Sequence, residues 1–189
     1  MSVLDLFILS QLDRGLETPY DLLRRAGLSL GATVPALRRL NAAGLIKREK
    51  ESTVSNRPRH VYRLTVKGEK QARTGWKHYL ANTAVSADLD EILRICDMAA
   101  HYTHPPPSIS AFLERAAQDR SSLAAQAQIG LDRQLGAVLA YTSTRAACET
   151  ERLKSEATVL ALLAFALKES LAKKARRSSG KNRKVTTRK

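Results

Sequence analysis

The pattern of apolar and polar positions predicts three short helices and then two strands over residues 1–65. Apolar residues recur at three- and four-residue spacings in segments 2–12, 19–25 and 29–43, as in amphipathic helices. Each segment begins at a residue suited to cap a helix and ends near a glycine: Ser2, Thr18 and Ser29; Gly15, Gly27 and Gly44. Strands are predicted near residues 45–51 and 59–65, joined by a polar turn, and Thr65 can cap a helix from Val66.

The third predicted helix has two dissimilar sides. Its predicted buried stripe contains Leu30, Val34, Leu37 and Leu40, and its outer side contains Ala32, Pro35, Arg38 and Arg39. A small, cationic outer side fits a DNA major groove. Pro35 removes a backbone hydrogen bond, so either Gly31 leaves room for a kink or the regular helix begins near Thr33. We favour a distorted first turn.

Long helical segments follow residue 80. Residues 86–100 predict an amphipathic helix with the stripe Leu89, Ile92, Leu93 and Cys96, ended by the prolines at 105–107. Residues 109–171 are predicted to be almost entirely helical, with bends or loops at Gly130, Gly136 and Thr142–Thr144. Their apolar positions require a partner: Ile129, Leu131, Leu135, Val138, Leu139, Leu153, Val159, Leu160, Leu163 and Leu167. We favour a second copy of the chain, with a hairpin within one chain as the alternative.

These elements divide the chain into three parts and predict a mainly α fold. Residues 1–78 have the element order of a winged helix-turn-helix domain, with three helices and a two-stranded wing. Residues 79–171 form a helical domain for dimerisation or effector binding. Residues 172–189 are predicted to be a disordered basic tail by composition.

Charge changes this picture by concentrating at the two ends. Residues 1–80 carry 15 basic and 7 acidic side chains, residues 81–171 carry 8 and 11, and residues 172–189 carry 9 and none. The net charge of +14 favours polyanionic partners, and neutralising phosphates would make binding sensitive to salt. Low aromatic content, 5%, also favours helices over a β-rich fold.

Other functional classes lack support in the sequence. Cys96 and Cys148 stand far apart, the four histidines show no ligand spacing, and we predict no metal or cofactor. There is no cluster of a nucleophile with a base, no paired carboxylates and no glycine-rich phosphate loop, so an enzyme is not expected. No signal peptide or membrane span is predicted, which favours a cytoplasmic protein associated with the bacterial nucleoid.

Two sequence motifs resemble the winged-helix domain of PadR-like transcriptional regulators. The family's Ser-x-Gly-Thr-Leu-Tyr-Pro-Ala-Leu-x-Arg-Leu run and its Gly-Leu-Ile are matched by Ser29, Gly31, Pro35, Ala36, Leu37, Arg39, Leu40 and residues 44–46. Its wing motif, Arg-x-x-Tyr-x-Leu-Thr-x-x-Gly, is matched by Arg59, Tyr62, Leu64, Thr65 and Gly68. Pro19-Tyr20-Asp21-Leu22 resembles its Gly-Tyr-Glu-Ile element. The resemblance spans residues 4 to about 72 and departs from the family at Ala32, Thr33 and Val34.

The resemblance implies a homodimer on an imperfect inverted-repeat operator, with repression relieved by a small molecule. It also implies an effector pocket with Tyr20 and Trp76 as candidate lining residues, although a lone tryptophan such as Trp76 is more often a packing residue. The candidate DNA-binding residues are Ser29, Ala32, Thr33, Pro35, Arg38, Arg39, Lys47, Arg48, Arg57, Arg59 and His60. In the tail, phosphate contacts are assigned to Lys173, Lys174, Arg176 and Arg177.

The leading hypothesis is therefore a sequence-specific regulator of transcription that binds double-stranded DNA. Two alternatives stay open. One is a less specific DNA-binding accessory protein of nucleoid type, suggested by the basic tail and the small side chains of the third helix. The other is a winged-helix module that binds proteins.

Overall fold

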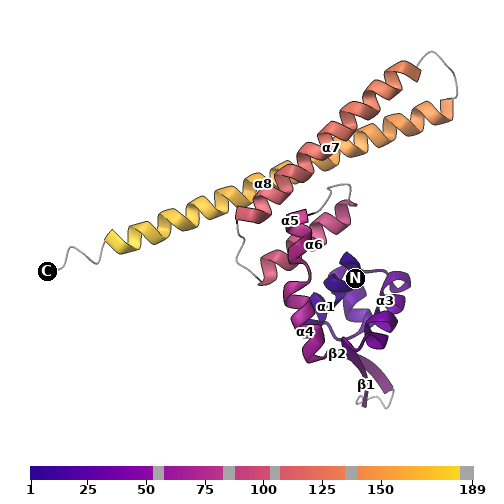
Figure 1. Cartoon of the computed structure of the whole chain (residues 1–189), viewed down its shortest axis with the longest axis vertical. Helices are drawn as coiled ribbons and strands as arrows, with labels where there is room; N and C mark the ends of the chain where they lie inside the picture. Colours follow the sequence, from indigo (N-terminus) through magenta and orange to yellow (C-terminus); the bar gives the residue numbers. More distant parts are fainter. Residues whose placement is uncertain (53–57, 83–87, 103–106, 135–139, 184–189) are drawn as a thin grey trace. The chain divides into compact units, whose positions relative to one another are not determined.

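The computed structural model describes residues 1–52, 58–82, 88–102, 107–134 and 140–183 (Figure 1). Two compact units make up the chain: unit 1 comprises Met1–Asn82 and Leu93–Tyr102, and unit 2 comprises Thr83–Ile92 and Thr103–Lys189. The elements are α1 Val3–Asp13, α2 Pro19–Ala26, α3 Leu30–Ala42, β1 Ile46–Ser52, β2 Pro58–Leu64, α4 Val66–Thr74, α5 Lys77–Asn82, α6 Leu89–Tyr102, α7 Pro107–Gln134 and α8 Ala140–Arg183. The predicted mainly α fold with a two-stranded wing is confirmed.

The helices of unit 1 begin at the predicted caps. Ser2 and Asp5 form a reciprocal capping box at α1, and the Thr18 side chain accepts a hydrogen bond from the Asp21 N–H at α2. Thr65 likewise caps α4, accepting from the Gly68 N–H at 3.1 Å. Gly27 and Gly44 follow α2 and α3 with φ of +68° and +66°, a conformation that costs glycine little.

Helix α1 is the centre of unit 1. It contacts α3, α4 and β2, and its apolar side chains are therefore buried around most of the helix: Val3, Leu6, Phe7, Ile8, Leu9 and Leu12. Helix α4 approaches the start of β1 so closely that a Cβ at Gly68 would lie 2.0 Å from the Leu45 carbonyl oxygen. Glycine is thus required at this contact.

Strands β1 and β2 form the wing. They pair antiparallel, with the register running from Ile46 opposite Leu64 to Ser52 opposite Pro58. The Tyr62 N–H, on the other edge of β2, donates to the Glu17 carbonyl at 2.8 Å. The loop before α2 thereby fixes the wing to the helical part of unit 1.

The C-terminal part of α6 belongs to unit 1 and meets α1 through polar contacts. Asp97 accepts hydrogen bonds from Gln11 Nε2 at 3.3 Å and from Arg14 at 3.2 Å. The predicted stripe is wrong at Leu93, which is 37% exposed, while the buried side chains include Ile95, Met98 and Ala99. Because α6 packs on α1, its buried side includes these three positions rather than Leu93. Burial and the Asp97 charge raise the pKa of Cys96 to about 12.

Unit 2 contains a helical hairpin, in which α7 and α8 pack against each other (Figure 1). Both helices continue through predicted bend positions, Gly130 and Thr142–Thr144, so those predictions are wrong. A glycine costs a helix only about 1 kcal/mol, which packing along the hairpin can offset. Gly136 lies outside the described residues.

The buried side of the hairpin is rich in alanine, which lets the two helices approach closely: Leu113, Ala116, Ala117, Ala124, Leu153, Ala157, Leu160 and Ala164. Leu153 and Leu160 are buried as predicted. Ile129, Val159 and Leu163 are exposed instead, and Leu131 and Leu167 are half-buried. The side chains of Leu135, Val138 and Leu139 lie outside the described residues. Pairing within the chain, the alternative to a dimer contact, therefore covers part of the predicted stripe.

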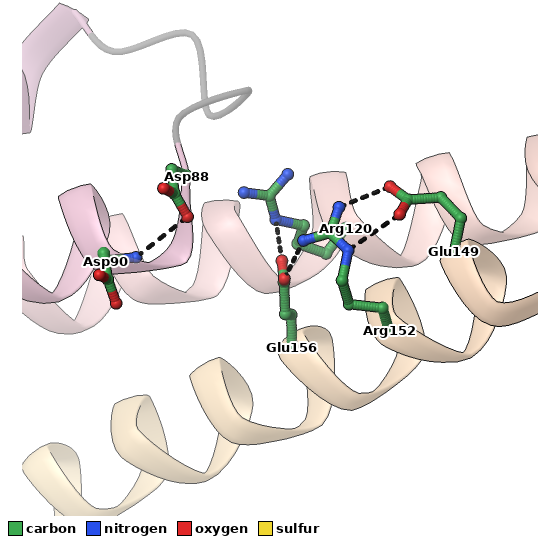
Figure 2. Close-up of polar contacts among 6 residues, drawn as sticks. All are labelled: Asp88, Asp90, Arg120, Glu149, Arg152 and Glu156. Atoms are coloured by element: carbon green, nitrogen blue, oxygen red, sulfur yellow. Dashed lines mark hydrogen bonds and ion pairs between the residues drawn. The ribbon is translucent and has the colours of Figure 1, made fainter. Parts of the chain in front are cut away.

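A cluster of charged side chains crosses this hairpin (Figure 2). Arg120 of α7 and Glu156 of α8 are 5% and 7% exposed, with Arg120 Nε 2.9 Å from Glu156 Oε2. Arg152 contacts both Glu156 and Glu149, and its hydrogen bond lowers the pKa of Glu149. A buried charge left without its partner is costly, so the pair favours one register of α7 against α8.

Helix α8 extends to Arg183 and covers residues 172–183 of the segment predicted to be disordered. Its Ala, Leu, Lys and Arg residues have high helix propensity, which the charge-based prediction did not weigh. In the described part of the chain, every helix is too short or too polar to span a bilayer.

Candidate nucleic-acid interface

Helix α3 presents the predicted side to solvent in its second half but not in its first turn. The buried positions are Thr33, Ala36, Leu37 and Leu40, while Leu30 is 47% exposed and Val34 is half-buried. The outward positions, three and four residues apart, are Gly31, Pro35, Arg38 and Asn41. The predicted stripe is therefore correct in the second half of α3 and wrong in its first turn.

Pro35 lies inside a continuous helix that begins at Leu30, so the predicted late start near Thr33 is wrong. A proline here leaves the Gly31 carbonyl without its helical donor. Both residues are exposed, and water can hydrate that carbonyl. Open space surrounds Gly31, where an added Cβ would meet nothing within 4 Å. Exposure thus explains why this proline is tolerated.

The start of α3 is held by its own side chains. Ser29 accepts a hydrogen bond from the Ala32 N–H at 3.3 Å, and Thr33 Oγ1 donates to the Ser29 carbonyl at 2.8 Å. Thr33 is fully buried, which contradicts its assignment as a DNA contact. Of the three candidates in this turn, Ser29 is exposed and Ala32 is half-buried.

Arg38 and Arg39 are both exposed, but their surroundings differ. Arg39 Nη2 lies 2.7 Å from Asp5 Oδ1, and the Asp5 side chain is only 11% exposed. This ion pair ties α3 to α1. Arg38 makes no hydrogen bond or ion pair within the described residues, so its guanidinium is available to a ligand.

The wing adds further cations beside α3. Lys47, Arg48 and Lys50 of β1 are exposed, and Lys50 lies opposite the half-buried His60 of β2. Arg63, by contrast, pairs with Glu49 at 3.1 Å. Arg59 lies in β2 opposite Glu51, its side chain being outside the described set, and Arg57 lies outside the described residues altogether.

The two candidate effector residues occupy different places. Tyr20 lines an open cleft of about 480 Å³ whose other lining residues are Thr18, Pro19, Asp21, Leu30 and His60. Trp76 is 2% exposed and is not among them. The cleft instead brings Tyr20 together with the first residue of α3 and with the wing.

Sequence reasoning missed two exposed polar residues near these elements. Arg24 lies in the last turn of α2 and contacts Tyr20, and Asn41 follows Arg38 by three residues on α3. The four-residue spacing of Tyr20 and Arg24 was a signal in the sequence, because such pairs meet on a helix.

Of the predicted tail contacts, Lys173 is exposed on α8, with its Nζ 3.5 Å from Glu169 Oε2. Lys174, Arg176 and Arg177 lie on the described backbone of α8, but their side chains are outside the described set. Apart from Lys173, the candidate DNA contacts whose side chains are described lie in unit 1.

Comparison with known proteins finds PadR-like transcriptional regulators. The model of the transcriptional regulator PadR-like family matches residues 15–74, which extend from the loop before α2 through α4. A solved structure similar to this chain is that of Bacillus subtilis PadR in complex with operator DNA, at 16% identity and a TM-score of 0.38. The match covers 88% of this chain and 98% of that one. No curated protein is significantly similar to the chain. The resemblance to PadR-like transcriptional regulators is confirmed over residues 15–74, which hold the helix-turn-helix and the wing.

Proposed function

We propose that this protein is a repressor that binds an imperfect inverted repeat in double-stranded DNA as a homodimer and responds to a small-molecule effector. The observation that carries the DNA-binding part is the outward side of α3 in a PadR-like domain. That side offers Arg38, small neighbours at Gly31 and Pro35, and an adjacent cationic strand. Such a surface can approach base edges closely.

Different residues are assigned different contacts in this proposal. Arg38 is the candidate for a base edge, because a free guanidinium can take guanine O6 and N7 together. Lys47, Arg48 and Lys50 are candidates for phosphate contacts, which hold the domain in register without reading sequence. Arg39 is assigned to holding α3 on α1.

The homodimer is supported by apolar side chains that the hairpin leaves exposed. Leu162 and Phe165 of α8 are 62% and 65% exposed, and Val159 is 44% exposed. Leu162 lies on the opposite side of α8 from the buried Leu160 and Ala164. Apolar patches of this kind on a folded protein mark interaction sites.

Selection of DNA from a random library by the full chain, at physiological salt, tests the proposal. The expected product is an inverted repeat with half-sites about one helical turn apart. Replacing Arg38 with Ala should weaken binding to the selected site about 10-fold or more and relax the preference at one position. Arg73→Ala, an exposed arginine on α4, is the matched control and should bind like the wild type.

Other selection results would support the alternative functions. A pool without sequence preference, bound nevertheless, would favour the accessory DNA-binding protein over the repressor. A chain that retains no DNA at all would favour the module that binds proteins.

A further inference from the structure

Tyr20 and Arg24 are exposed on α2, and they contact each other in two ways. Arg24 Nε donates a hydrogen bond to Tyr20 Oη at 2.8 Å. Its Cζ also lies 5.4 Å from the centroid of the Tyr20 ring, within cation–π range. The Tyr20 side chain is held in solvent, with 58% of the residue exposed. The pair therefore fixes a guanidinium that would otherwise sample many rotamers.

The position of this pair links it to the candidate DNA interface. Tyr20 lines the same cleft as Leu30, the first residue of α3, and His60 of β2. Tyr20 thus lies close to both the start of α3 and the wing. In a helix-turn-helix bound to DNA, the helix before the one in the major groove crosses the phosphate backbone, and α2 holds that place before α3.

The hydrogen-bonding chemistry of the pair suits a phosphate. Once Nε is used by Tyr20, the terminal N–H groups of Arg24 remain as donors, and the phenolic O–H of Tyr20 can donate as well. Arginine and a hydroxyl are common donors to phosphate oxygens. The carboxylate that lines this cleft, Asp21, would repel an anion, so the phosphate is assigned to the exposed side chains of Tyr20 and Arg24.

We propose that Tyr20 and Arg24 form a preorganised clamp for one DNA backbone phosphate beside α3. The inference rests on the proposed function, since it assumes that this surface faces DNA. The clamp contributes affinity without sequence preference and sets the angle at which α3 enters the groove. Tyr20 is thereby assigned to DNA rather than to an effector pocket.

Binding of the full chain to its selected site and to random DNA of equal length, measured over a range of salt concentrations, tests the clamp. Arg24→Ala should weaken both complexes by the same factor, about 5- to 10-fold, and lower the salt slope by about one. Tyr20→Phe keeps the ring and the charge but loses the hydroxyl. It should weaken both complexes about threefold with the slope unchanged.

Arg25→Ala is the matched control, because Arg25 is an exposed arginine next in the chain and is not held by Tyr20. Equal losses for Arg24→Ala and Arg25→Ala would assign the effect to overall charge and overturn the clamp. Losses confined to the selected site would also overturn it, since they would indicate a base contact. Thermal midpoints confirm that each variant is folded. Arg24→Lys keeps the charge and should keep the salt slope, but it should bind DNA more weakly because lysine lacks the planar guanidinium.

The same data separate this inference from the proposed function. If the wild type prefers its selected site and all clamp variants bind like the wild type, only the clamp is wrong. If the wild type binds all sequences equally and the clamp variants are weaker, the clamp stands and the sequence-specific repressor does not. A wild type that binds no DNA overturns both.

Discussion

Two neighbouring arginines on α3 show how surroundings decide the role of a single side chain. Arg39 is tied to the nearly buried carboxylate of Asp5, which itself belongs to the capping box of α1. Arg38, one residue earlier, has no such partner among the described residues. The first is therefore expected to matter for folding and the second for binding.

At the residue scale we predict that Arg39→Ala and Arg38→Ala separate stability from DNA binding. Arg39→Ala should lower the free energy of unfolding by about 0.5–1 kcal/mol, a modest value because the arginine is 57% exposed. Arg38→Ala should change it by less than about 0.5 kcal/mol. Urea denaturation measures both. If Arg39→Ala lost DNA binding without losing stability, Arg39 would be a DNA contact rather than a residue that holds α3 on α1.

Unit 1 depends on close contact between elements, most clearly where α4 meets the start of β1. There the backbone at Gly68 leaves no space for a side chain beside the Leu45 carbonyl. Thr65, which caps α4, also donates its hydroxyl to the Gly44 carbonyl at 2.8 Å. The end of α3, the first strand and α4 are thus held together by backbone contacts.

At the element scale, Gly68→Ala and Gly31→Ala should have opposite effects on stability. The methyl group at residue 68 would force α4 away from β1 and cost about 2 kcal/mol or more. At residue 31 it meets open space in a helix and should stabilise by about 0.5–1 kcal/mol. Thermal denaturation of the two variants measures the difference. Similar midpoints for both would contradict the close approach.

In unit 1, features that depend on neighbouring residues were predicted correctly, and features that depend on distant contacts were not. The caps at Ser2, Thr18, Ser29 and Thr65 follow from neighbouring residues, and the structure has all of them. The rotation of α3 in its first turn depends on which neighbours cover it, and the stripe of α6 depends on docking to α1. Such information is absent from periodicity alone.

The same distinction applies to the candidate site. The exposure of Arg38 was predicted correctly because the side of α3 on which it lies follows from local spacing, and its contact with DNA stays a prediction. The partner of Arg39 is Asp5, 34 residues away along the chain, and no spacing rule connects them. Thr33 was assigned from its position near the N-terminal end of the helix, but in the structure it is buried and its hydroxyl donates to the Ser29 carbonyl inside the first turn.

At the scale of the whole molecule, the chain combines a basic domain with a hairpin that leaves apolar side chains exposed. The hairpin is closed internally by alanines and by the Arg120–Glu156 pair. What remains outside, around Leu162 and Phe165, is the surface assigned to the second copy.

We predict that the double variant Leu162→Glu and Phe165→Glu converts a dimer into a monomer. Two charges in an apolar interface would be desolvated without partners, which strongly disfavours association. Light scattering coupled to gel filtration measures the mass. Ser170→Glu, an exposed polar position further along α8, is the control and should stay dimeric. A wild type that is monomeric at high concentration would overturn the dimer proposal.

The position of Trp76 has a spectroscopic consequence. It is the single tryptophan of the chain, and it is 2% exposed inside unit 1. Its fluorescence therefore reports on the environment of the winged-helix unit alone. Far-UV circular dichroism, in contrast, reports on the helices of both units, including α7 and α8, which have 28 and 44 residues. Following both signals in one denaturation distinguishes the melting of the winged-helix unit from that of the hairpin, without a label or an added probe.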